Sequence, residues 1–527
     1  MSLFNFIVRQ IEKTPDKVFL QFEKNRITYN ELYNNIGGIA RGLHECGVTH
    51  GDKVCIMMNN CPEYIDVWFA LSYLKAVSVP INVHLKGEGL HYLISHSDCN
   101  VVVLDEDFLP YVAEVISNIK REIVFIVRKT NGNYSFKEIF EQAKYIPFEQ
   151  LGKDKEFPYF ERTSSSDLNN ILYTSGTTGR SKGVMLSDDS YLQSSESFIN
   201  YMCQATSDDI LFTTLPLFHI NAQAHTVLGG IYANATIAFS KKFSASLFWD
   251  EVRYHKATIF NSLGSMIPIL YKQPKKENDC ENPARLTVCA ATPKEFWKPF
   301  EERFGVRIIE GYGLTETTGF CMSNPMNRGK ISSFGKPFPG VSAKIVNDSN
   351  EEIADGEVGE ILIKAEESNI LMDGYYKMPE KTLEVLDDGW FRTGDRGYKD
   401  PEGYFYFSSR KKDVIRRRGE NVSAWEVERI VNNHPKVVES AAIGVLSEVG
   451  EEDIKIFIIL KQNEKLSPEG ILDWCVEKMA YFMVPRYVEF VDEFPKTSTE
   501  RIQKYKLIEK GNEASWDREA ENYVIKR

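Results

Sequence analysis

The sequence predicts an α/β protein: a large N-terminal part with two α/β sheet subdomains and a β-rich subdomain, then a small α+β C-terminal domain. Three observations predict this fold class. Helical and strand-like segments alternate from residue 29 to residue 104, and the alternation resumes over residues 168–260. Beyond about Gly335 the chain changes to short β-like segments separated by Gly and Asp. Strands that alternate with helices imply mostly parallel sheets with helices on their faces.

The first half of the chain shows the alternation clearly. Apolar residues recur at helical spacing over 29–43, and Thr28 with Glu31 forms a capping box that predicts the start of this helix. The segments that follow predict a strand over 54–58, a proline-opened helix over 62–75, extended chain over 76–83 and a strand over 101–104. A polar, Lys-rich stretch over 144–167 predicts a surface connection between lobes.

The second half repeats the pattern before the texture changes. Strand-like segments occur over 168–173, 211–215, 236–239 and 258–260. After the charged run at 410–418, a helix over 423–433, strands near 441–445 and 455–460 and a helix over 468–479 predict a compact terminal domain. We place the boundary at the charged run, which gives an N-terminal domain of residues 1–411 and a C-terminal domain of residues 412–527.

Length, charge and cysteine content restrict the function classes. The 527 residues correspond to about three domain-sized units. A net charge of −12 argues against a nucleic-acid partner, which would need a broad basic face. The nine cysteines form no CxxC pair and predict neither a disulfide framework nor a zinc site. No stretch is apolar enough to span a bilayer and no signal peptide opens the chain, so a cytoplasmic protein without an integral membrane segment is expected.

A segment rich in Gly, Ser and Thr, TSGTTGRSKG, follows the strand-like residues 170–173. Glycines let backbone N–H groups approach phosphate oxygens, hydroxyls add donors and a lysine adds charge, so a strand, this loop and a following helix would cradle phosphate. The candidate ligands are Thr174, Ser175, Gly176, Thr177, Thr178, Gly179 and Lys182. The loop is not a Walker A motif, because Ser181 precedes Lys182 and Gly183 follows it. The alternative is a flexible surface turn.

Two further motifs carry groups suited to a nucleotide. In EGYGLTET, Tyr312 lies between two glycines and can lie flat on a purine, while Thr315 and Glu316 offer a hydroxyl and a hard oxygen ligand for Mg²⁺. In DGWFRTGD, the carboxylate of Asp395 can accept both hydroxyls of a ribose. Taken alone, such a tyrosine is more often a packing residue and such an aspartate a turn residue.

The three motifs in this order resemble the adenylate-forming, AMP-binding superfamily, which includes acyl-CoA synthetases, adenylation domains of peptide synthetases and firefly luciferase. The resemblance covers essentially the whole chain. It implies a large N-terminal domain, a small mobile C-terminal domain and two half-reactions at one site. A carboxylate first attacks the α-phosphate of ATP·Mg²⁺ to give acyl-AMP and pyrophosphate, and a thiol, usually that of coenzyme A, then displaces AMP.

The resemblance implies roles for individual residues. The loop with Lys182 is similar to a pyrophosphate cradle, Tyr312 with the adjoining Gly313 to an adenine platform, Thr315 to an α-phosphate contact and Glu316 to the Mg²⁺ ligand. Near the end of the N-terminal domain, Asp395 and Arg410 look like ribose ligands. Lys412 looks like the hinge, and Gly419 in the C-terminal domain looks like the residue that leaves room for the pantetheine arm of CoA. Without the neighbouring motifs, the run at 410–418 could be a solvated basic turn.

One position departs from the family pattern. The family usually reads P-K-T-x-x-G-K-I near its C-terminus, and the final lysine bridges substrate carboxylate and ATP, whereas this chain reads PKTSTERI with Arg501 in that place. A planar guanidinium keeps the charge but prefers bidentate contacts. Three outcomes are open: Arg501 is catalytic, Lys504 or Lys506 replaces it, or adenylation is slow. We favour the first.

The acyl pocket is expected near His219. Residues 216–221 resemble a segment whose Phe-His pair, here Phe218 and His219, walls the acid site, and residues 261–268 resemble another wall. His219 could equally be a core histidine. FHINAQ, residues 244–260 and GENVSAWEVE look most like crotonobetaine/carnitine-CoA ligase and its short- to medium-chain relatives. Asn221, however, stands where an aspartate would suit the quaternary ammonium of a betaine.

The expected function is therefore that of an ATP-dependent acid:CoA ligase, a monomer or homodimer whose small-molecule partners are a carboxylic acid, ATP and CoA. The acid is expected to be small to medium in size or carnitine-like. Two alternatives stay open: an acyl-adenylate ligase that loads a carrier protein or an amine, and a catalytically weakened ATP- or acyl-binding regulator, which Arg501 would motivate.

Overall fold

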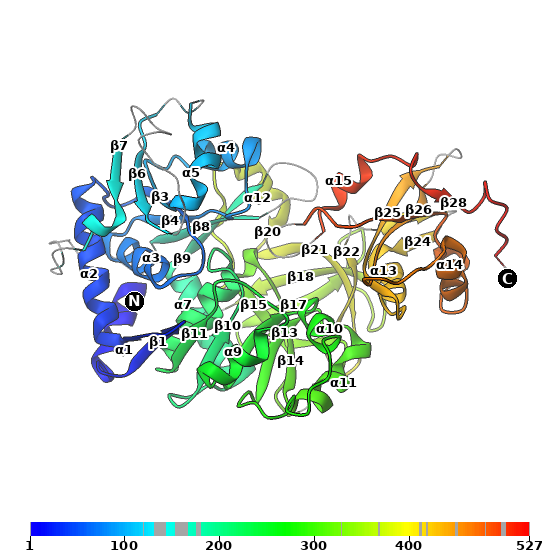
Figure 1. The fold of residues 1–527 in the computed structure, drawn as a ribbon, viewed down its shortest axis with the longest axis horizontal. Coiled ribbons are helices and arrows are strands. Elements are labelled where there is room, and N and C mark those ends of the chain that lie inside the picture. Colours follow the sequence, from blue (N-terminus) through cyan, green and yellow to red (C-terminus); the bar gives the residue numbers. More distant parts are fainter. Residues whose placement is uncertain are drawn as a thin grey trace. The chain divides into compact units, whose positions relative to one another are not determined.

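The computed structural model describes most of the chain (Figure 1). The described residues are 2–117, 119, 121–130, 144–152, 157, 167–174, 181–327, 329–366, 369–410, 414–417, 420–447, 452–479, 481–496 and 502–525. Two compact units form: one comprises Met1–Gly176, Arg180–Ser342 and Lys364–Phe391, and the other comprises Thr177–Gly179, Ala343–Ile363 and Arg392–Arg527. The helices found in the described residues are all too short or too polar to cross a lipid bilayer.

The first sheet of the first unit is mostly parallel. Its strands in spatial order are β19 (Gly374–Tyr375), β9 (Lys182–Ser187), β8 (Leu168–Thr174), β4 (Val77–Pro80), β3 (Lys53–Met57), β5 (Val101–Asp105), β6 (Val124–Arg128) and β7 (Lys144–Pro147). The pairs β19–β9 and β9–β8 are antiparallel, whereas the pairs from β8 to β7 are parallel.

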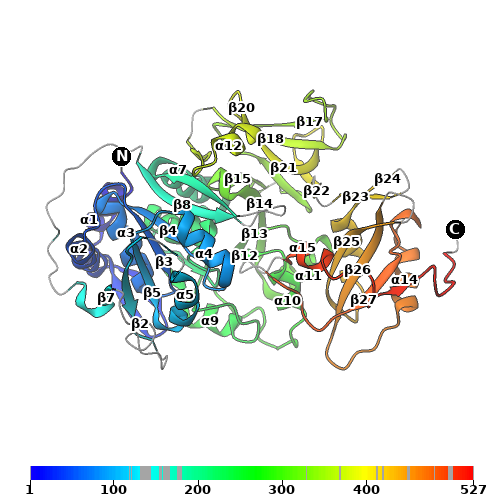
Figure 2. The same ribbon diagram turned by 90° about the horizontal axis from the view of Figure 1, so that it is seen from above.

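Helices lie on both faces of this sheet (Figure 2). The helices are α2 (Tyr29–Glu45) and α3 (Pro62–Leu74) on one side and α4 (Gly87–His96) and α5 (Leu109–Ile116) on the other. Ile56 and Val103 pack in one buried cluster with α2 and α3, while Cys55 and Val102 pack in a second cluster with α4 and α5. This period of two is what a sheet covered on both faces requires.

The second sheet of this unit has a parallel centre. Its strands in spatial order are β16 (Ser333–Pro337), β15 (Gly319–Ser323), β14 (Arg307–Leu314), β13 (Leu286–Ala290), β12 (Ile259–Leu263), β10 (Ile210–Thr213), β11 (Thr236–Phe239), β1 (Val18–Phe22) and β2 (Asn25–Thr28). The pairs from β14 to β1 are parallel, and the outer pairs are antiparallel.

The remaining helices of the first unit pack around these two sheets. They are α1 (Leu3–Lys13), α7 (Asp188–Ser197), α8 (Gly229–Tyr232), α9 (Phe248–His255), α10 (Met266–Tyr271), α11 (Lys294–Phe304) and α12 (Pro379–Val385), with the π-helices η3 (Phe198–Cys203) and η4 (Asn221–Leu228) and the 3₁₀ turns η1 (Glu106–Phe108), η2 (Phe148–Gln150) and η5 (Thr315–Thr317). A two-residue strand, β20 (Leu386–Asp387), pairs with the start of β21 (Trp390–Lys399).

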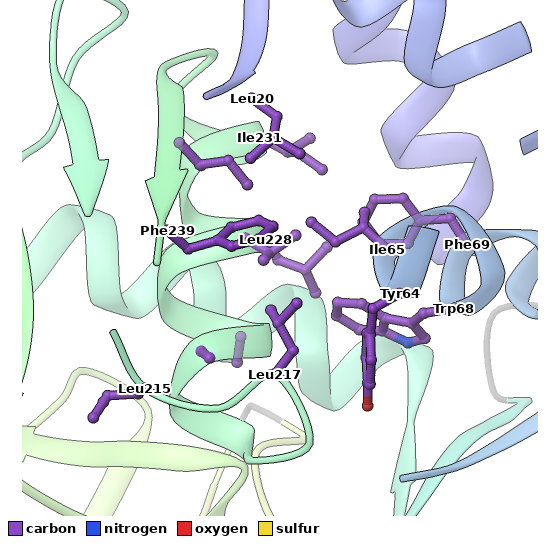
Figure 3. Packing of buried hydrophobic residues seen from close by; sticks show 14 of the residues in the cluster. Leu20, Tyr64, Ile65, Trp68, Phe69, Leu215, Leu217, Leu228, Ile231 and Phe239 are labelled. Carbon is purple, nitrogen blue, oxygen red and sulfur yellow. The ribbon is translucent and has the colours of Figure 1, made fainter. Parts of the chain in front are cut away.

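One continuous core connects the two sheets. Figure 3 shows side chains of α3, including Ile65 and Trp68, packed near Leu228 of η4 and Phe239 of β11. Trp68 is fully buried, and its indole N–H donates to Asn169 Oδ1 at 3.0 Å. Side chains of α3 therefore contribute to the core that the two sheets of this unit share.

The sequence predicted most of these elements, and one departure lies at an edge of the first sheet. The capping box is present, since Thr28 Oγ1 accepts from Glu31 N at 3.1 Å and Glu31 Oε2 accepts from Thr28 N at 2.7 Å. The interpretation of residues 144–167 as a surface connection is wrong for Lys144–Pro147, which form the parallel edge strand β7. An edge strand is covered on few sides, so its composition can be as polar as that of a loop.

The second unit contains the predicted β-rich segment and a small α+β domain. Its strands are β17 (Val341–Val346), β18 (Gly359–Ala365), β21 and β22 (Phe405–Arg410), the pair β23 (Val414–Arg417) and β24 (Glu420–Ser423), and the sheet of β25 (Val437–Leu446), β26 (Glu452–Leu460), β27 (Tyr487–Phe490) and β28 (Trp516–Asp517). Its helices are α13 (Ala424–Asn432), α14 (Pro468–Val476), α15 (Lys504–Ile508) and the 3₁₀ turn η6 (Tyr481–Met483).

Arg417 at the end of the basic run is not solvated. It is 2% exposed, its Nε lies 3.2 Å from Asp453 Oδ1, and its Nη1 donates to Phe482 O at 3.0 Å and to Val484 O at 2.6 Å. The interpretation of the whole run as a solvated basic turn is therefore wrong for this residue, which links β23 to the domain core.

Candidate functional site

The Gly-, Ser- and Thr-rich segment joins two antiparallel strands. β8 ends at Thr174 and β9 begins at Lys182, and these two residues are register partners. The prediction that a helix follows the loop directly is wrong, because α7 begins only at Asp188. The apolar residues Val184 and Leu186 are buried in the core, which favours a strand there. Ser175, Gly176, Thr177, Thr178 and Gly179 lie outside the described residues.

Lys182 and Glu316 meet at the same aromatic ring. Lys182 Nζ lies 3.9 Å from the ring centroid of Tyr375, and Tyr375 Oη donates to Glu316 Oε1 at 2.9 Å. Glu316 and Thr315 belong to η5, the turn at the end of β14. Burial and the neighbouring Glu316 carboxylate raise the pKa of Tyr375 well above its usual value, so its O–H remains a donor. The structure thus brings two predicted ligands, Lys182 and Glu316, together at a tyrosine that the motifs did not indicate.

Tyr312 is held in place within β14. It is 9% exposed, and its ring stacks on Phe334 with a centroid distance of 4.6 Å and an angle of 27°. At Gly313, an added Cβ would lie 1.9 Å from Gly319 O, so the close approach of β14 to β15 requires glycine. At the predicted adenine platform, packing therefore fixes the ring of Tyr312, and the backbone at Gly313 leaves no room for a side chain larger than that of glycine.

Glu310 adds a buried carboxyl group that the motif contained but whose importance the sequence reasoning missed. It is 5% exposed and is the register partner of Cys289 at the end of β13. Burial raises the pKa of Glu310 to about 8. A protonated carboxyl can both donate and accept, which suits the edge of an amide or a purine. Ala291 has a φ of 61°, a left-handed conformation that is uncommon outside glycine.

His219 lies beside a cluster of neutral polar groups. Its ring is 4.6 Å from that of the buried Phe218, and η4 begins two residues later. Asn261, at 2% exposure in β12, donates to Asn221 Oδ1 at 2.9 Å and to Thr226 Oγ1 at 3.1 Å. The structure therefore joins the two walls predicted from the sequence through amide and hydroxyl groups.

A fully buried histidine, His225, lies about one turn into η4. His225 is stacked between Phe198 at 4.8 Å and Phe320 at 4.7 Å, and Phe320 N donates to its Nε2 at 3.3 Å. Burial lowers the pKa of His225 to about 3, so the imidazole is neutral. π-Helices such as η3 and η4 often occur at functional sites. A polar residue within a buried helical segment was the available signal for His225.

The second unit carries the predicted ribose ligand Asp395. It lies in β21 at 4% exposure, its N–H donates to Thr393 Oγ1 at 3.1 Å, and its register partner in β22 is Arg410. Asp395 and Arg410 therefore occupy neighbouring positions on adjacent strands. Lys412, Gly419 and Arg501 lie outside the described residues.

The donor set of the first unit fits a magnesium-bound phosphate. Carboxylate oxygens such as those of Glu316 are ligands that Mg²⁺ prefers, and an ammonium such as that of Lys182 pairs with phosphate oxygens. The hydroxyls of Thr174 and Thr315 are half-buried and stand at the ends of β8 and β14.

Comparison with known proteins identifies the family of this chain. Residues 7–376 match the AMP-binding enzyme family, and residues 426–501 match the AMP-binding enzyme C-terminal domain. Crotonobetaine/carnitine–CoA ligase of Escherichia coli O157:H7 (strain EC4115 / EHEC) is 33% identical over 487 residues, 91% of this chain and 92% of that protein. The protein of the same name from Shigella flexneri is also 33% identical over 91% of this chain and 92% of its own.

Solved structures of acyl-CoA ligases share the fold. The anthranilate CoA ligase AuaEII in complex with anthranoyl-AMP superposes with a TM-score of 0.84 at 26% identity, covering 96% of each chain. ATP-bound MatB from Rhodopseudomonas palustris superposes with a TM-score of 0.83 at 27% identity, covering 97% of this chain and 99% of that one. The two family domains, the order of the motifs and the shared fold lead to one conclusion: this chain belongs to the AMP-binding enzyme family, among its AMP-forming acyl-CoA synthetases.

Proposed function

We propose that this protein is an ATP-dependent acid:CoA ligase that forms an acyl-AMP with release of pyrophosphate and then a CoA thioester with release of AMP. The observation that carries this proposal is the convergence of Lys182 and Glu316 on Tyr375. Opposite charges held at one ring match a nucleotide that presents both phosphate oxygens and a divalent metal.

The residues of the chain act by positioning and by stabilising charge. A carboxylate is a poor electrophile, and esterification to phosphate removes its charge and supplies a leaving group. Lys182 stabilises the departing pyrophosphate, Thr315 donates to the α-phosphate, and Tyr312 supports the adenine. Glu316 would hold Mg²⁺, which would neutralise phosphate charge when bound. Asp395 and Arg410 bind the ribose hydroxyls, and Gly419 admits the pantetheine arm.

The acid is proposed to be small to medium in size or carnitine-like. The similarity to crotonobetaine/carnitine–CoA ligase supports the carnitine-like acids. The hydrogen bond from Asn261 to Asn221 supports uncharged acids, since neutral amides provide no counter-ion for a quaternary ammonium.

A pyrophosphate-release screen distinguishes these acids. Small, medium-chain and aromatic acids are tested with carnitine and crotonobetaine, each with and without CoA. We expect release with small to medium acids and CoA-dependent formation of AMP. Response only to amino acids or very long chains would contradict the proposed pocket, and AMP formation only with a carrier protein would favour the carrier-loading alternative.

Arg501 is proposed to perform the role of the family lysine in adenylation. We expect Arg501→Ala to reduce acid-dependent pyrophosphate exchange by about 100-fold, because a charge that contacts both reactants in the transition state is lost. Arg501→Lys is the matched variant and should retain most of the exchange. Unchanged exchange in Arg501→Ala would assign the role to another residue, for which Lys504→Ala and Lys506→Ala are the next variants.

The remaining organisation is proposed on family similarity. The N-terminal domain spans residues 1–411, the C-terminal domain spans residues 412–527, and Lys412 is the hinge between the two half-reactions. The protein is proposed to be a cytoplasmic monomer or homodimer.

A further inference from the structure

Tyr375 contacts two candidate ATP ligands that come from distant parts of the sequence. Its hydroxyl donates to the Glu316 carboxylate at 2.9 Å, and its ring face lies 3.9 Å from the Lys182 ammonium. Tyr375 itself is 3% exposed, while Lys182 and Glu316 are half-buried, so both contacts are partly shielded from water. An ammonium over an aromatic face is attracted by the ring quadrupole, and this attraction is stronger where water is excluded.

The backbone holds Tyr375 rigidly at this place. Tyr375 pairs with Val184 across β19 and β9, and its N–H donates to Thr382 Oγ1 at 2.9 Å. On one side Tyr376 N donates to Gly183 O at 2.8 Å, and on the other Met372 N donates to Glu316 O at 2.9 Å. A single short segment is thus anchored both to the start of β9 and to the main chain of Glu316.

A lysine and a glutamate that lie close together in a partly shielded site attract one another. A direct ion pair would occupy the carboxylate oxygens and ammonium protons that a metal and a phosphate need. A phenol engages both groups without neutralising either, since its hydroxyl orients one carboxylate oxygen and its ring face steadies the ammonium.

We propose that Tyr375 is a positioning residue that orients the Glu316 carboxylate toward the nucleotide-bound metal and holds Lys182 toward the phosphates. This inference rests on the proposed roles of Glu316 and Lys182. Outer-shell partners of metal-ligating carboxylates commonly change metal affinity by about 10- to 100-fold when they are removed.

Tyr375→Phe tests the hydroxyl alone, because the ring is kept. Mn²⁺ replaces Mg²⁺ as the probe, and its binding to the protein saturated with a non-hydrolysable ATP analogue is followed by electron paramagnetic resonance. We expect Tyr375→Phe to weaken Mn²⁺ binding about tenfold, while binding of the analogue without metal stays unchanged. Tyr375→Leu also removes the ring face and should weaken binding of the metal-free analogue as well.

Tyr376→Phe is the matched control. This neighbouring tyrosine donates to Asp98 Oδ2 at 2.9 Å, and loss of its hydroxyl should leave Mn²⁺ binding unchanged. Equal Mn²⁺ affinity in Tyr375→Phe and wild type, or an equal loss in Tyr376→Phe, would overturn the proposal. Glu316→Gln distinguishes failure of the positioning role from failure of the proposed function of the site. Normal Mn²⁺ binding by Glu316→Gln would contradict the proposed function of the site. Weakened binding by Glu316→Gln with normal binding by Tyr375→Phe would contradict the positioning role alone.

Discussion

Replacing Lys182 with alanine is expected to lower acid-dependent pyrophosphate release by about 100- to 1,000-fold, the loss typical of removing one group aimed at charge that develops in a transition state. The ammonium stands at the start of β9, directly after the Gly-rich segment and over the Tyr375 ring. Lys182 is the only charged residue of β9 (Lys182–Ser187), so no other side chain of this strand can replace its charge. Lys182→Arg should retain only part of the activity, because a guanidinium is wider than an ammonium.

Stopped-flow or coupled detection of pyrophosphate at saturating acid and ATP measures this effect. Lys241→Ala is the matched control, because Lys241 is exposed and forms an ion pair with Glu23 at 2.7 Å. Surface ion pairs of this kind contribute about 0–1 kcal/mol, so the control should retain wild-type activity and stability. Near-normal pyrophosphate release by Lys182→Ala would remove this lysine from the proposed site.

Arg417→Ala is expected to destabilise the C-terminal domain by about 3 kcal/mol, because removal of one partner leaves a buried ion pair incomplete. Among the residues that the structure describes, Asp453, with its side chain 7% exposed, would keep Arg486 as its one ion-pair partner, with Nη1 2.9 Å away. The carbonyl of Phe482 would also lose the Arg417 donor, whereas that of Val484 would keep the weaker hydrogen bond from Arg518 Nη1 at 3.3 Å. The expected loss of stability therefore has both an electrostatic and a hydrogen-bonding contribution.

Denaturant unfolding of the full chain, followed by tryptophan fluorescence, detects this change as a lower midpoint of the transition of the C-terminal domain. Lys478→Ala serves as the control in the same domain, since Lys478 is partly exposed and pairs with Glu477 at 3.3 Å. It should shift the free energy of unfolding by less than about 0.5 kcal/mol. An unchanged midpoint in Arg417→Ala would mean that the buried pair adds nothing to the stability of this domain.

Periodicity was sufficient for most of the fold. Residues 29–43, 62–75 and 101–104 became α2, α3 and β5 because their apolar spacing and caps agree with the layers that bury them. The local sequence pattern was misleading at Lys182–Ser187. The glycine-rich loop before these residues suggested a following helix, but the residues form strand β9 and pair with β8. Strand pairing is a tertiary property, and local spacing does not specify a partner.

The motifs identified most of the candidate ligands but not the residue that connects them. Tyr375 and Glu316 are 59 positions apart, and nothing in the local pattern of Tyr375 distinguishes it from a packing tyrosine. His225 and Glu310 were missed for a related reason: their significance comes from burial, which shifts their pKa values in opposite directions, to about 3 and about 8. Burial of a single polar side chain is decided by the whole fold.

The antiparallel connection from β8 to β9 decides how this protein can attract anions. A phosphate loop that leads into a helix borrows roughly half a positive charge from the aligned peptide dipoles at the helix start, and this field attracts any anion. The strand β9, which begins at Lys182 after this segment, supplies no such field, because strand dipoles largely cancel. Attraction of an anion at this strand must therefore come from individual hydrogen-bond donors and charged side chains at fixed positions. Binding then depends on whether the oxygens of the anion match these positions and not on its charge alone.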